Sequence, residues 1–281
     1  MLRTSFSALI LAAGKGTRMR SRLPKALHCL GGRPMAERLI IEARKAGASK
    51  IFVVAGHGWD QVKKALPKNI TLIHQKERLG SGHAVFVSEK ALSSVTGSLL
   101  VLYCDTPLLK SQTLRTLVQK QHQAKTDATL LSVNLENPFG YGRVILKRGQ
   151  FVERIVEQND ATDDERKIRH INVGCYVFNK KKLFAALKQV KRNQRKKEYY
   201  LTDAVGILAA GGPVQAFPAA DVEETYGVND PTELARAEEI LRRRILERWM
   251  GSGVCIRDPK TTFIDSDVRL GQDTVILPST V

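Results

Sequence analysis

The stretch Leu9-Ile10-Leu11-Ala12-Ala13-Gly14-Lys15-Gly16-Thr17-Arg18-Met19 decides the fold, and Arg22-Leu23-Pro24-Lys25-Ala26-Leu27 follows it directly. A short apolar run that ends in a glycine-rich turn predicts a buried strand opening into an anion-binding loop. A dinucleotide-binding loop would need a third glycine where Met19 stands, and a P-loop would need Gly-Lys-Ser/Thr after four free residues. Both of these better-known glycine patterns are therefore excluded.

The glycines and cations of this stretch predict a site for a nucleoside triphosphate or a phosphosugar. Gly14 and Gly16 let the backbone approach an anion closely, and Arg18 and Lys25 supply the opposite charge. The alternative is a strand followed by an ordinary glycine turn with solvated cations. Pro24 favours the phosphate site, because it fixes the backbone just before the lysine that has to reach the anion.

Length and composition limit the class of protein. A chain of 281 residues can form a full α/β core with a small appendage. The first apolar run, residues 8–13, is too short for a signal peptide or a membrane span, so we expect a cytoplasmic protein with no membrane partner. Four widely separated cysteines without metal-ligand spacing are expected to be reduced core thiols: Cys29, Cys104, Cys175 and Cys255.

The net charge of +17 raises a nucleic-acid hypothesis. Basic clusters lie at 180–182, 191–197 and 242–244. No stacking aromatic residues interleave with them, and two of the clusters fall on expected helices, where a solvated charged face is usual. We therefore expect no nucleic-acid partner, and we attribute part of the charge to anionic substrates.

Helix and strand patterns alternate along the chain. Strands are expected at 8–13, 51–55, 99–103, 129–135 and 171–178, and helices at 35–46, 82–94, 111–124, 180–190 and 202–210. This rhythm predicts an α/β fold with a doubly wound, mostly parallel, Rossmann-like sheet. Ligands of such sheets bind outside the carboxyl ends of the strands, where residues 14–25 and 103–108 both fall. The two loops are expected to face one site.

A long helix is expected after Asn229. Asp230 is a suitable N-cap, Pro231 suits the first turn, Glu233 stands at the spacing of a capping box, and Gly251 can end the helix. An apolar stripe predicts packing along one face: Leu234, Leu241, Ile245 and Trp249. We interpret this helix as a connecting arm that leads away from the main domain.

Three hexapeptides follow the arm, with Ile264, Leu270 and Ile276 at six-residue spacing. Hexapeptide periodicity is typical of a parallel β-helix, and three hexads would form one triangular coil. Because a solenoid needs about three or more repeats to bury its own core, we infer a truncated repeat domain. The alternative is an ordinary β tail with accidental spacing.

Two residues are candidate metal ligands. Asp105 follows an apolar strand and precedes a proline turn, where a carboxylate can bind Mg²⁺ facing a triphosphate. Asn229 offers a neutral oxygen that could share the ion. The alternatives are that Asp105 caps the next turn and that Asn229 is a plain turn residue.

Taken together, these motifs resemble the bacterial N-acetylglucosamine-1-phosphate uridylyltransferases, and the resemblance covers essentially the whole chain. It rests on the loop at 11–19 with Pro24-Lys25, Gln75 before Leu79-Gly80-Ser81-Gly82-His83-Ala84, Tyr103-Cys104-Asp105, Gly140-Tyr141-Gly142-Arg143, Glu157, Ile171-Asn172, Glu198-Tyr199-Tyr200 with Thr202-Asp203, and Gly227-Val228-Asn229. In that family a long helix joins this domain to a left-handed β-helix acetyltransferase domain.

The resemblance implies three parts: a nucleotidyltransferase domain at 1–229, a helical linker arm at 230–251, and the start of a hexapeptide-repeat left-handed β-helix at 252–281. Acetyl transfer to glucosamine 1-phosphate is not expected from this chain, because it would need the rest of the β-helix. The family's β-helix also drives trimerisation, so the resemblance leaves a homotrimer open for a longer chain.

Site residues carry over by position. The implied nucleotide-binding residues are Leu11, Ala12, Ala13, Gly14, Gln75, Gly80, Ser81 and Tyr103, and the implied sugar-binding residues are Gly140, Glu157, Asn172 and Asn229. Arg18 and Lys25 would be catalytic, and Asp105 and Asn229 would hold Mg²⁺. The chain departs from the family pattern at three positions: Ser81 replaces threonine, Cys104 replaces glycine, and His170 replaces glutamate.

The implied reaction transfers UMP from UTP to N-acetylglucosamine 1-phosphate and releases pyrophosphate. It proceeds by in-line attack on the α-phosphorus and needs no enzyme nucleophile. His57 and His83 are accordingly expected to be loop or capping residues rather than general bases. Two other functions remain open: nucleotidyl transfer to another sugar 1-phosphate, and a non-catalytic scaffold of the same fold.

Overall fold

The computed structural model describes residues 5–147 and 151–281, and its core is a nine-stranded sheet. The strand order is β5-β4-β1-β6-β10-β7-β11-β9-β8. The bounds are β1 Phe6–Ala12, β4 Ile51–Ala55, β5 Thr71–His74, β6 Ser98–Tyr103, β7 Ala128–Asn134, β8 Arg143–Lys147, β9 Phe151–Val156, β10 His170–Asn179 and β11 Val214–Pro218. The α/β sheet expected from the sequence is confirmed.

The direction of two strands makes the sheet mixed. Strands β5, β4, β1 and β6 pair in parallel. The alternating pattern predicted β1, β4 and β6, but not β5. Strand β10 lies antiparallel between β6 and β7, and β9 lies antiparallel between β11 and β8. The connection from β6 through α4 to β7 skips one place in the sheet, and β10 fills that place from the opposite direction. An apolar run in the sequence does not show whether its strand will pair in parallel or antiparallel with its neighbours.

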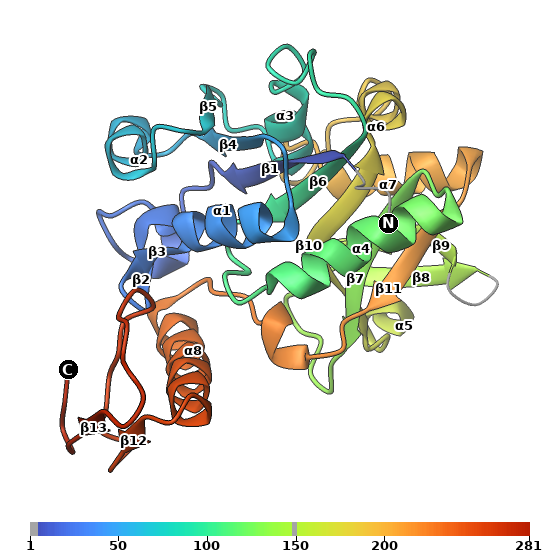
Figure 1. Ribbon diagram of the computed structural model, residues 1–281. Coiled ribbons are helices and arrows are strands. Elements are labelled where there is room, and N and C mark those ends of the chain that lie inside the picture. The colour runs from blue at the N-terminus through green and yellow to red at the C-terminus, as the bar shows by residue number, and fades with distance from the viewer. Residues whose placement is uncertain (1–4, 148–150) are drawn as a thin grey trace.

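Helices cover both faces of the sheet. Successive residues of β1 point to opposite faces, so Ala8 and Ile10 pack in one cluster and Leu9 and Leu11 in another. The helices of the first cluster are α1 (Met35–Ala46) and α4 (Ser111–Ala124), which lie over the sheet in Figure 1. Those of the second are α3 (Ser81–Phe86), α6 (Lys180–Leu187) and α7 (Leu201–Gly211). Two short helices complete the main domain, α2 (Trp59–Ala65) and α5 (Asp163–Arg166).

One helix is shorter than the pattern predicted. The sequence favours a helix over 82–94, but α3 ends at Phe86 and turns follow to residue 94. After Phe86 the chain continues as turns, in which the N–H groups of Ser88, Glu89 and Ser93 donate to the carbonyls three residues earlier. The ammonium of Lys180 donates hydrogen bonds to the main-chain carbonyls of Leu92, Ser93 and Val95, at the end of this segment.

The long helix α8 spans Pro231–Gly251, with Asp230 as its N-cap. The Asp230 carboxylate accepts the Glu233 N–H at 2.8 Å, as expected. The predicted capping box differs in its return bond, because the Glu233 carboxylate accepts the N–H of Asn229 at 2.6 Å. The start of the arm is therefore bonded to a candidate site residue.

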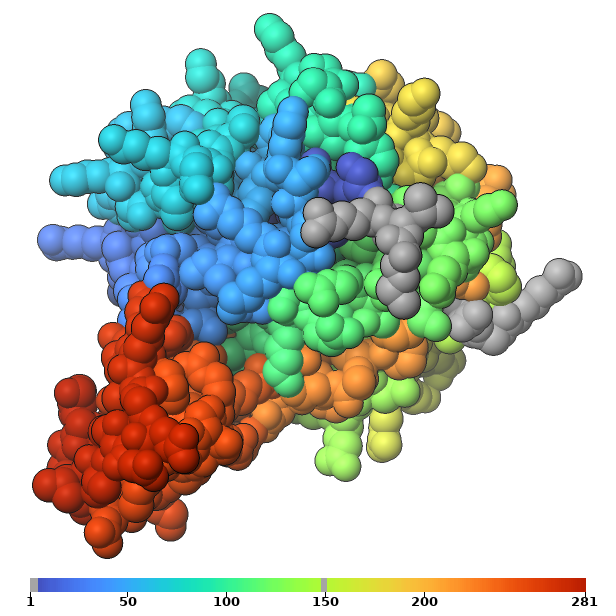
Figure 2. Space-filling view, in the orientation of Figure 1, coloured from blue at the N-terminus to red at the C-terminus, as the bar shows by residue number. Residues whose placement is uncertain are grey.

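The arm and the segment after it form a lobe beside the main domain (Figures 1 and 2). Leu241 and Ile245 of α8 pack with Leu30 of β2 (Cys29–Leu30) and with Val254. Strand β2 itself pairs with β3 (Arg33–Pro34). The apolar stripe of the arm therefore holds α8 against the segment that precedes α1.

The C-terminal segment forms one parallel strand pair. Strands β12 (Cys255–Ile256) and β13 (Val275–Ile276) are parallel, with Cys255 opposite Val275. A parallel pair cannot be closed by a hairpin turn, so the chain between them must loop round, as a coil does. Ile264 is buried, and Leu270 and Ile276 pack against the same cluster as α8. That this is the first coil of a β-helix stays a prediction.

The cysteine prediction holds for two residues. All four thiols are free, and Cys104 and Cys175 are buried, but Cys29 and Cys255 are exposed. The last two lie on the two-residue strands β2 and β12, where the next residue of each strand, Leu30 or Ile256, takes the buried face and the cysteine takes the opposite one. Among the described residues, no helix has both the length and the apolar character needed to cross a bilayer.

Leu241→Ala tests the packing of the arm. Leu241 is 6% exposed, so we expect its truncation to lower the free energy of unfolding by roughly 2–5 kcal/mol in urea denaturation. Arg236→Ala, at an exposed position of the same helix, should change it by less than about 0.5 kcal/mol. Equal, small effects of the two substitutions would show that α8 is not held by this contact.

Candidate active site

A cavity of about 400 Å³ opens at the carboxyl ends of β1 and β6. It is lined by Leu11, Ala13, Gly14, Lys15, Lys25, Gln75, Arg78, Gly80, Ser81, Ala84, Tyr103, Cys104, Asp105 and Glu198. The loop after β1 and the loop after β6 thus share one cavity, at the edge of the sheet where the strand pattern put a ligand. Most of the implied nucleotide-binding residues lie in its lining.

The two glycines of the first loop have different physical roles. A Cβ on Gly16 would lie 2.7 Å from the Cβ of Lys25, and Gly16 has a φ of +62°. Glycine is therefore required here for the lysine to pass. A Cβ on Gly14, in contrast, would meet no heavy atom within 4 Å. The open space beside Gly14 belongs to the cavity, so a ligand can approach the backbone at this point.

Lys25 joins the two candidate metal ligands. Its ammonium donates to the Asp105 carboxylate at 2.8 Å and to the Asn229 side-chain oxygen at 2.8 Å. A backbone hydrogen bond of 2.7 Å from the Val228 N–H to the Asp105 carbonyl ties the same two loops together. Residues far apart in the sequence therefore meet around one positive charge.

The donor set at this point suits a hard divalent cation. The described residues contain no group of three or more His, Cys, Asp and Glu side chains that could hold a metal ion. Mg²⁺, however, commonly takes only one or two carboxylates and fills its shell with water and substrate phosphate. One carboxylate oxygen of Asp105 and the amide oxygen of Asn229 fit that requirement, and both already bind a cation in the form of Lys25.

Two of the predicted catalytic and nucleotide-binding residues lie outside the cavity lining. Arg18 is exposed on the 3₁₀ turn Thr17–Met19, whereas Ala12 is buried against the α1 side of the sheet. Five lining residues were not among the predicted site residues: Lys15, Arg78, Ala84, Cys104 and Glu198. Lys15 stands between the two glycines, and its position in that loop was the signal that could have identified it.

The implied sugar-binding residues form a neighbouring group rather than part of this lining. The Asn172 amide donates to the Tyr176 hydroxyl at 2.6 Å, and the Tyr176 ring packs against the Tyr103 ring at a centroid distance of 6.0 Å. Burial raises the pKa of Tyr103, and the charges of Glu157 and Asp105 raise it further. Tyr103 lines the cavity and packs against Tyr176, so it joins the cavity to the group around Asn172.

A buried arginine fixes the loop of Gly140. The Gln158 side-chain oxygen accepts the Gly140 N–H at 3.0 Å and the Arg143 guanidinium at 2.8 Å. Arg143 is only 1% exposed and also donates to the carbonyls of Tyr141 and Arg166. The Gly140 loop and the Glu157–Gln158 turn are thus held together by one side chain.

Cys104 lies in the cavity as a neutral thiol, and two histidines contact residues of the lining. Burial, helped by the Asp105 charge, raises the pKa of Cys104 to about 12, so the thiol in the cavity stays neutral and is a poor nucleophile. The Gln75 amide donates to the Gly80 carbonyl at 3.1 Å and lies 2.9 Å from Nδ1 of His83. His83 thus contacts a side chain of the lining, and His57 contacts Arg78.

Glu157 provides a pH-dependent test of the site. Burial raises the pKa of Glu157 above its ordinary value of 4.5, although the Thr202 hydroxyl, which donates at 2.9 Å, acts in the opposite sense. The raised pKa means that ionisation of this carboxyl opposes folding. We expect Glu157→Gln to raise the Tm, by an amount that grows from pH 4.5 up to the folded-state pKa and is constant above it. Glu153→Gln, at an exposed position of β9, is the control, and a pH-independent difference for Glu157→Gln would contradict the expectation.

Comparison with known proteins agrees with this geometry. Residues 8–203 match the MobA-like NTP transferase domain. The chain is 44% identical over 275 residues to the bifunctional protein GlmU of Halalkalibacterium halodurans, and 43% identical over 275 residues to that of Caldanaerobacter subterraneus subsp. tengcongensis. Each match covers 98% of this chain and 60% of the relative, so the chain spans about 60% of the length of these curated relatives.

Solved structures share the fold. A UDP-glucose pyrophosphorylase complexed with UDP-glucose aligns with a TM-score of 0.69 at 16% identity, covering 85% of this chain and 99% of the other. A putative glucose-1-phosphate thymidylyltransferase from Bacillus anthracis aligns with a TM-score of 0.67 at 19% identity, covering 84% and 95%. The match over residues 8–203 settles the family: the chain belongs to the MobA-like NTP transferase domains.

Proposed function

We propose that this chain transfers UMP from UTP to N-acetylglucosamine 1-phosphate, giving UDP-N-acetylglucosamine and pyrophosphate. The observation that carries the proposal is the Lys25 ammonium, held between Asp105 and Asn229 at the edge of the cavity that opens beside Gly14. The identity of 44% to a GlmU protein over 98% of the chain supports this choice within the family.

The chemistry requires positioning and charge rather than an enzyme nucleophile. A phosphate oxygen of the sugar 1-phosphate attacks the α-phosphorus of UTP, the bond from that phosphorus to the bridging oxygen breaks, and pyrophosphate leaves with the electron pair. Lys25, at the edge of the cavity, would neutralise charge that develops on the transferred phosphoryl group. Lys15 and Arg78, which also line the cavity, add positive charge for the phosphates of UTP.

The residues of the site divide between the two substrates. Gln75, Gly80 and Ser81 would hold the base, and Gly140, Glu157 and Asn172 would hold the acetamido sugar beyond Tyr103. A divalent ion, which we propose is Mg²⁺, would be held by Asp105 and Asn229 and would supply a Lewis acid for the reacting phosphates. Arg18 is proposed to act on the phosphates from the exposed turn after Gly16, outside the cavity lining.

The wider assignments are proposals as well. We propose a cytoplasmic enzyme whose partners are its two substrates. The relatives are named bifunctional. We propose that their second activity, and any homotrimer, requires the part of their length that this chain does not match.

The reaction is tested by pyrophosphate release from UTP. We expect release that depends on both Mg²⁺ and N-acetylglucosamine 1-phosphate, with glucose 1-phosphate a poorer acceptor. Faster release with glucose 1-phosphate would assign the chain to another sugar. No release with any sugar 1-phosphate would favour a non-catalytic scaffold.

Lys25→Ala tests the proposed catalytic group. Removal of a positive charge aimed at the reacting phosphates should lower kcat by about 100-fold or more. The substitution also leaves Asp105 without its cation, so the variant's Tm must be recorded beside its rate. A folded variant with near-normal kcat would remove Lys25 from the mechanism.

Gly14→Ala tests whether the open space beside Gly14 is where UTP binds. Its Cβ meets nothing within 4 Å, so the Tm should not change, but the methyl group should obstruct the nucleotide and weaken UTP binding by about tenfold or more, measured by calorimetry. Gly211→Ala is the matched control, since a Cβ there also meets nothing within 4 Å and the residue ends α7. Unchanged UTP affinity in Gly14→Ala would show that the nucleotide binds elsewhere.

A further inference from the structure

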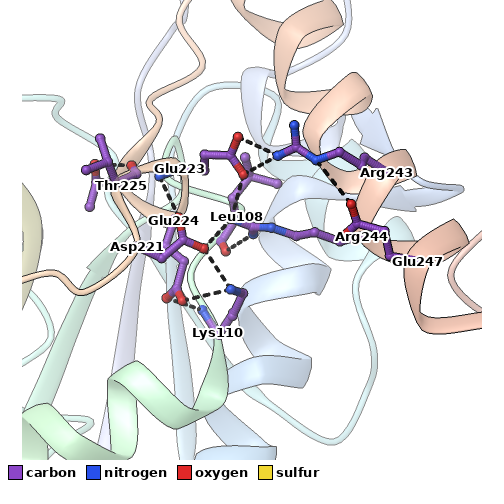
Figure 3. A network of polar contacts seen from close by, with 10 residues as sticks. Leu108, Lys110, Asp221, Glu223, Glu224, Thr225, Arg243, Arg244 and Glu247 are labelled. Atoms are coloured by element: carbon purple, nitrogen blue, oxygen red, sulfur yellow. Dashed lines mark hydrogen bonds and ion pairs between the residues drawn. The ribbon is translucent and has the colours of Figure 1, made fainter. Parts of the chain in front are cut away.

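A network of polar contacts joins three segments next to the proposed site (Figure 3). The segments are the loop after β6 at 106–110, the turn that contains the 3₁₀ helix Val222–Thr225, and the arm α8. Neither the motifs nor the family match singles out this network, because its members have no common spacing in the sequence. They meet only in the fold.

Arg244 is the centre of the network. One of its terminal nitrogens donates to the Leu108 carbonyl at 3.1 Å, and the other donates to the Asp221 carboxylate at 3.0 Å. Its side chain is 18% exposed. A planar guanidinium can hold two acceptors in a fixed geometry, so this one residue of the arm sets the separation of two loops of the main domain.

Lys110 closes the network from the other side. Its ammonium pairs with the same Asp221 oxygen at 2.8 Å and with Glu224 at 3.2 Å, and its N–H donates to the Glu224 carboxylate at 3.1 Å. Burial acts to raise the pKa of Asp221, but the hydrogen bonds from Lys110 and the Glu223 N–H, with the Arg244 charge, lower it. Asp221 therefore stays ionised as the shared acceptor of both cations.

The two loops held by this network carry the proposed metal ligands. Leu108 follows Asp105 closely in the sequence, and the turn at 222–225 leads directly into Val228 and Asn229. The loops also touch through the bond between the Val228 N–H and the Asp105 carbonyl. A shift of Leu108 relative to Asp221 would therefore be passed to the pair of oxygens that Lys25 contacts.

We propose that Arg244 is a positioning residue for the transfer reaction. From the arm, outside the main sheet, it holds the Asp105 loop and the Asn229 loop at the separation that the reacting phosphates and Lys25 require. This inference rests on the proposed function. It assigns the arm a part in the activity of the main domain, besides its position between that domain and the C-terminal segment.

Arg244→Gln and Arg243→Gln form a matched pair of variants. Arg243 precedes Arg244 on the same helix and is 51% exposed, and its contacts are with Glu223 and Glu247, not with Leu108 or Asp221. We expect Arg244→Gln to lower kcat by about 10- to 100-fold with a much smaller change in the KM for UTP, because misplacement of about 1 Å at reacting groups has this effect. Arg243→Gln should leave kcat within about twofold, as expected for an exposed ion pair. Arg244→Lys, which keeps the charge but cannot bridge both acceptors, should fall between.

A second readout does not depend on activity. If Arg244 holds the two loops together, amide hydrogen exchange in a peptide that contains Val228 should be about tenfold faster in Arg244→Gln than in Arg243→Gln, with similar Tm values for the two variants. Equal exchange in the two variants, or equal kcat, would overturn the role of Arg244. An unsubstituted protein that releases no pyrophosphate would instead overturn the proposed function, and the exchange experiment would still decide whether Arg244 holds the loops.

Discussion

The contact on which the site depends is that of the Lys25 ammonium with Asp105 and Asn229. This contact joins three segments: the loop after β1, the loop after β6 and the start of α8. The Lys25 side chain is 12% exposed and that of Asp105 is 30% exposed, so the charges are partly removed from water and each needs the other. A side chain at position 16 would collide with Lys25, so the glycine is required there by steric fit as well as by the chemistry of anion binding.

Much of the fold could be predicted because its signals are local. Helix 35–46 with its glycine cap, helix 111–124 and strand 51–55 lie where periodicity and capping residues put them. The early end of α3 and the direction of β10 were not predicted, and the direction of β10 depends on which gap the other strands leave open in the sheet. A window of ten residues does not show which gap that is.

The candidate site shows the same division. The residues on β1, on β6 and in the loops directly after them converge, because the ends of parallel strands meet at one edge. The sequence shows the charge of Arg18 but not the direction of its side chain, and Arg18 lies exposed on a turn outside the cavity lining. The contacts of Arg244 could not be predicted at all, since Leu108, Asp221 and the arm are brought together only by tertiary packing.

The position of β10 also determines the order in which the site can form. The cavity belongs to β1 and β6, whereas Asn172 and the rings beside it belong to β10, which pairs with β6 on one side and β7 on the other. Strand β7 cannot join the sheet until β10, later in the sequence, has entered between it and β6. Pairings between such distant segments form slowly, because the closure entropy of a long loop is lost before the contacts are gained. The half of the site at Gly14 therefore needs only the pairings of β5, β4, β1 and β6, whereas the half at Asn172 also needs β10 in place between β6 and β7.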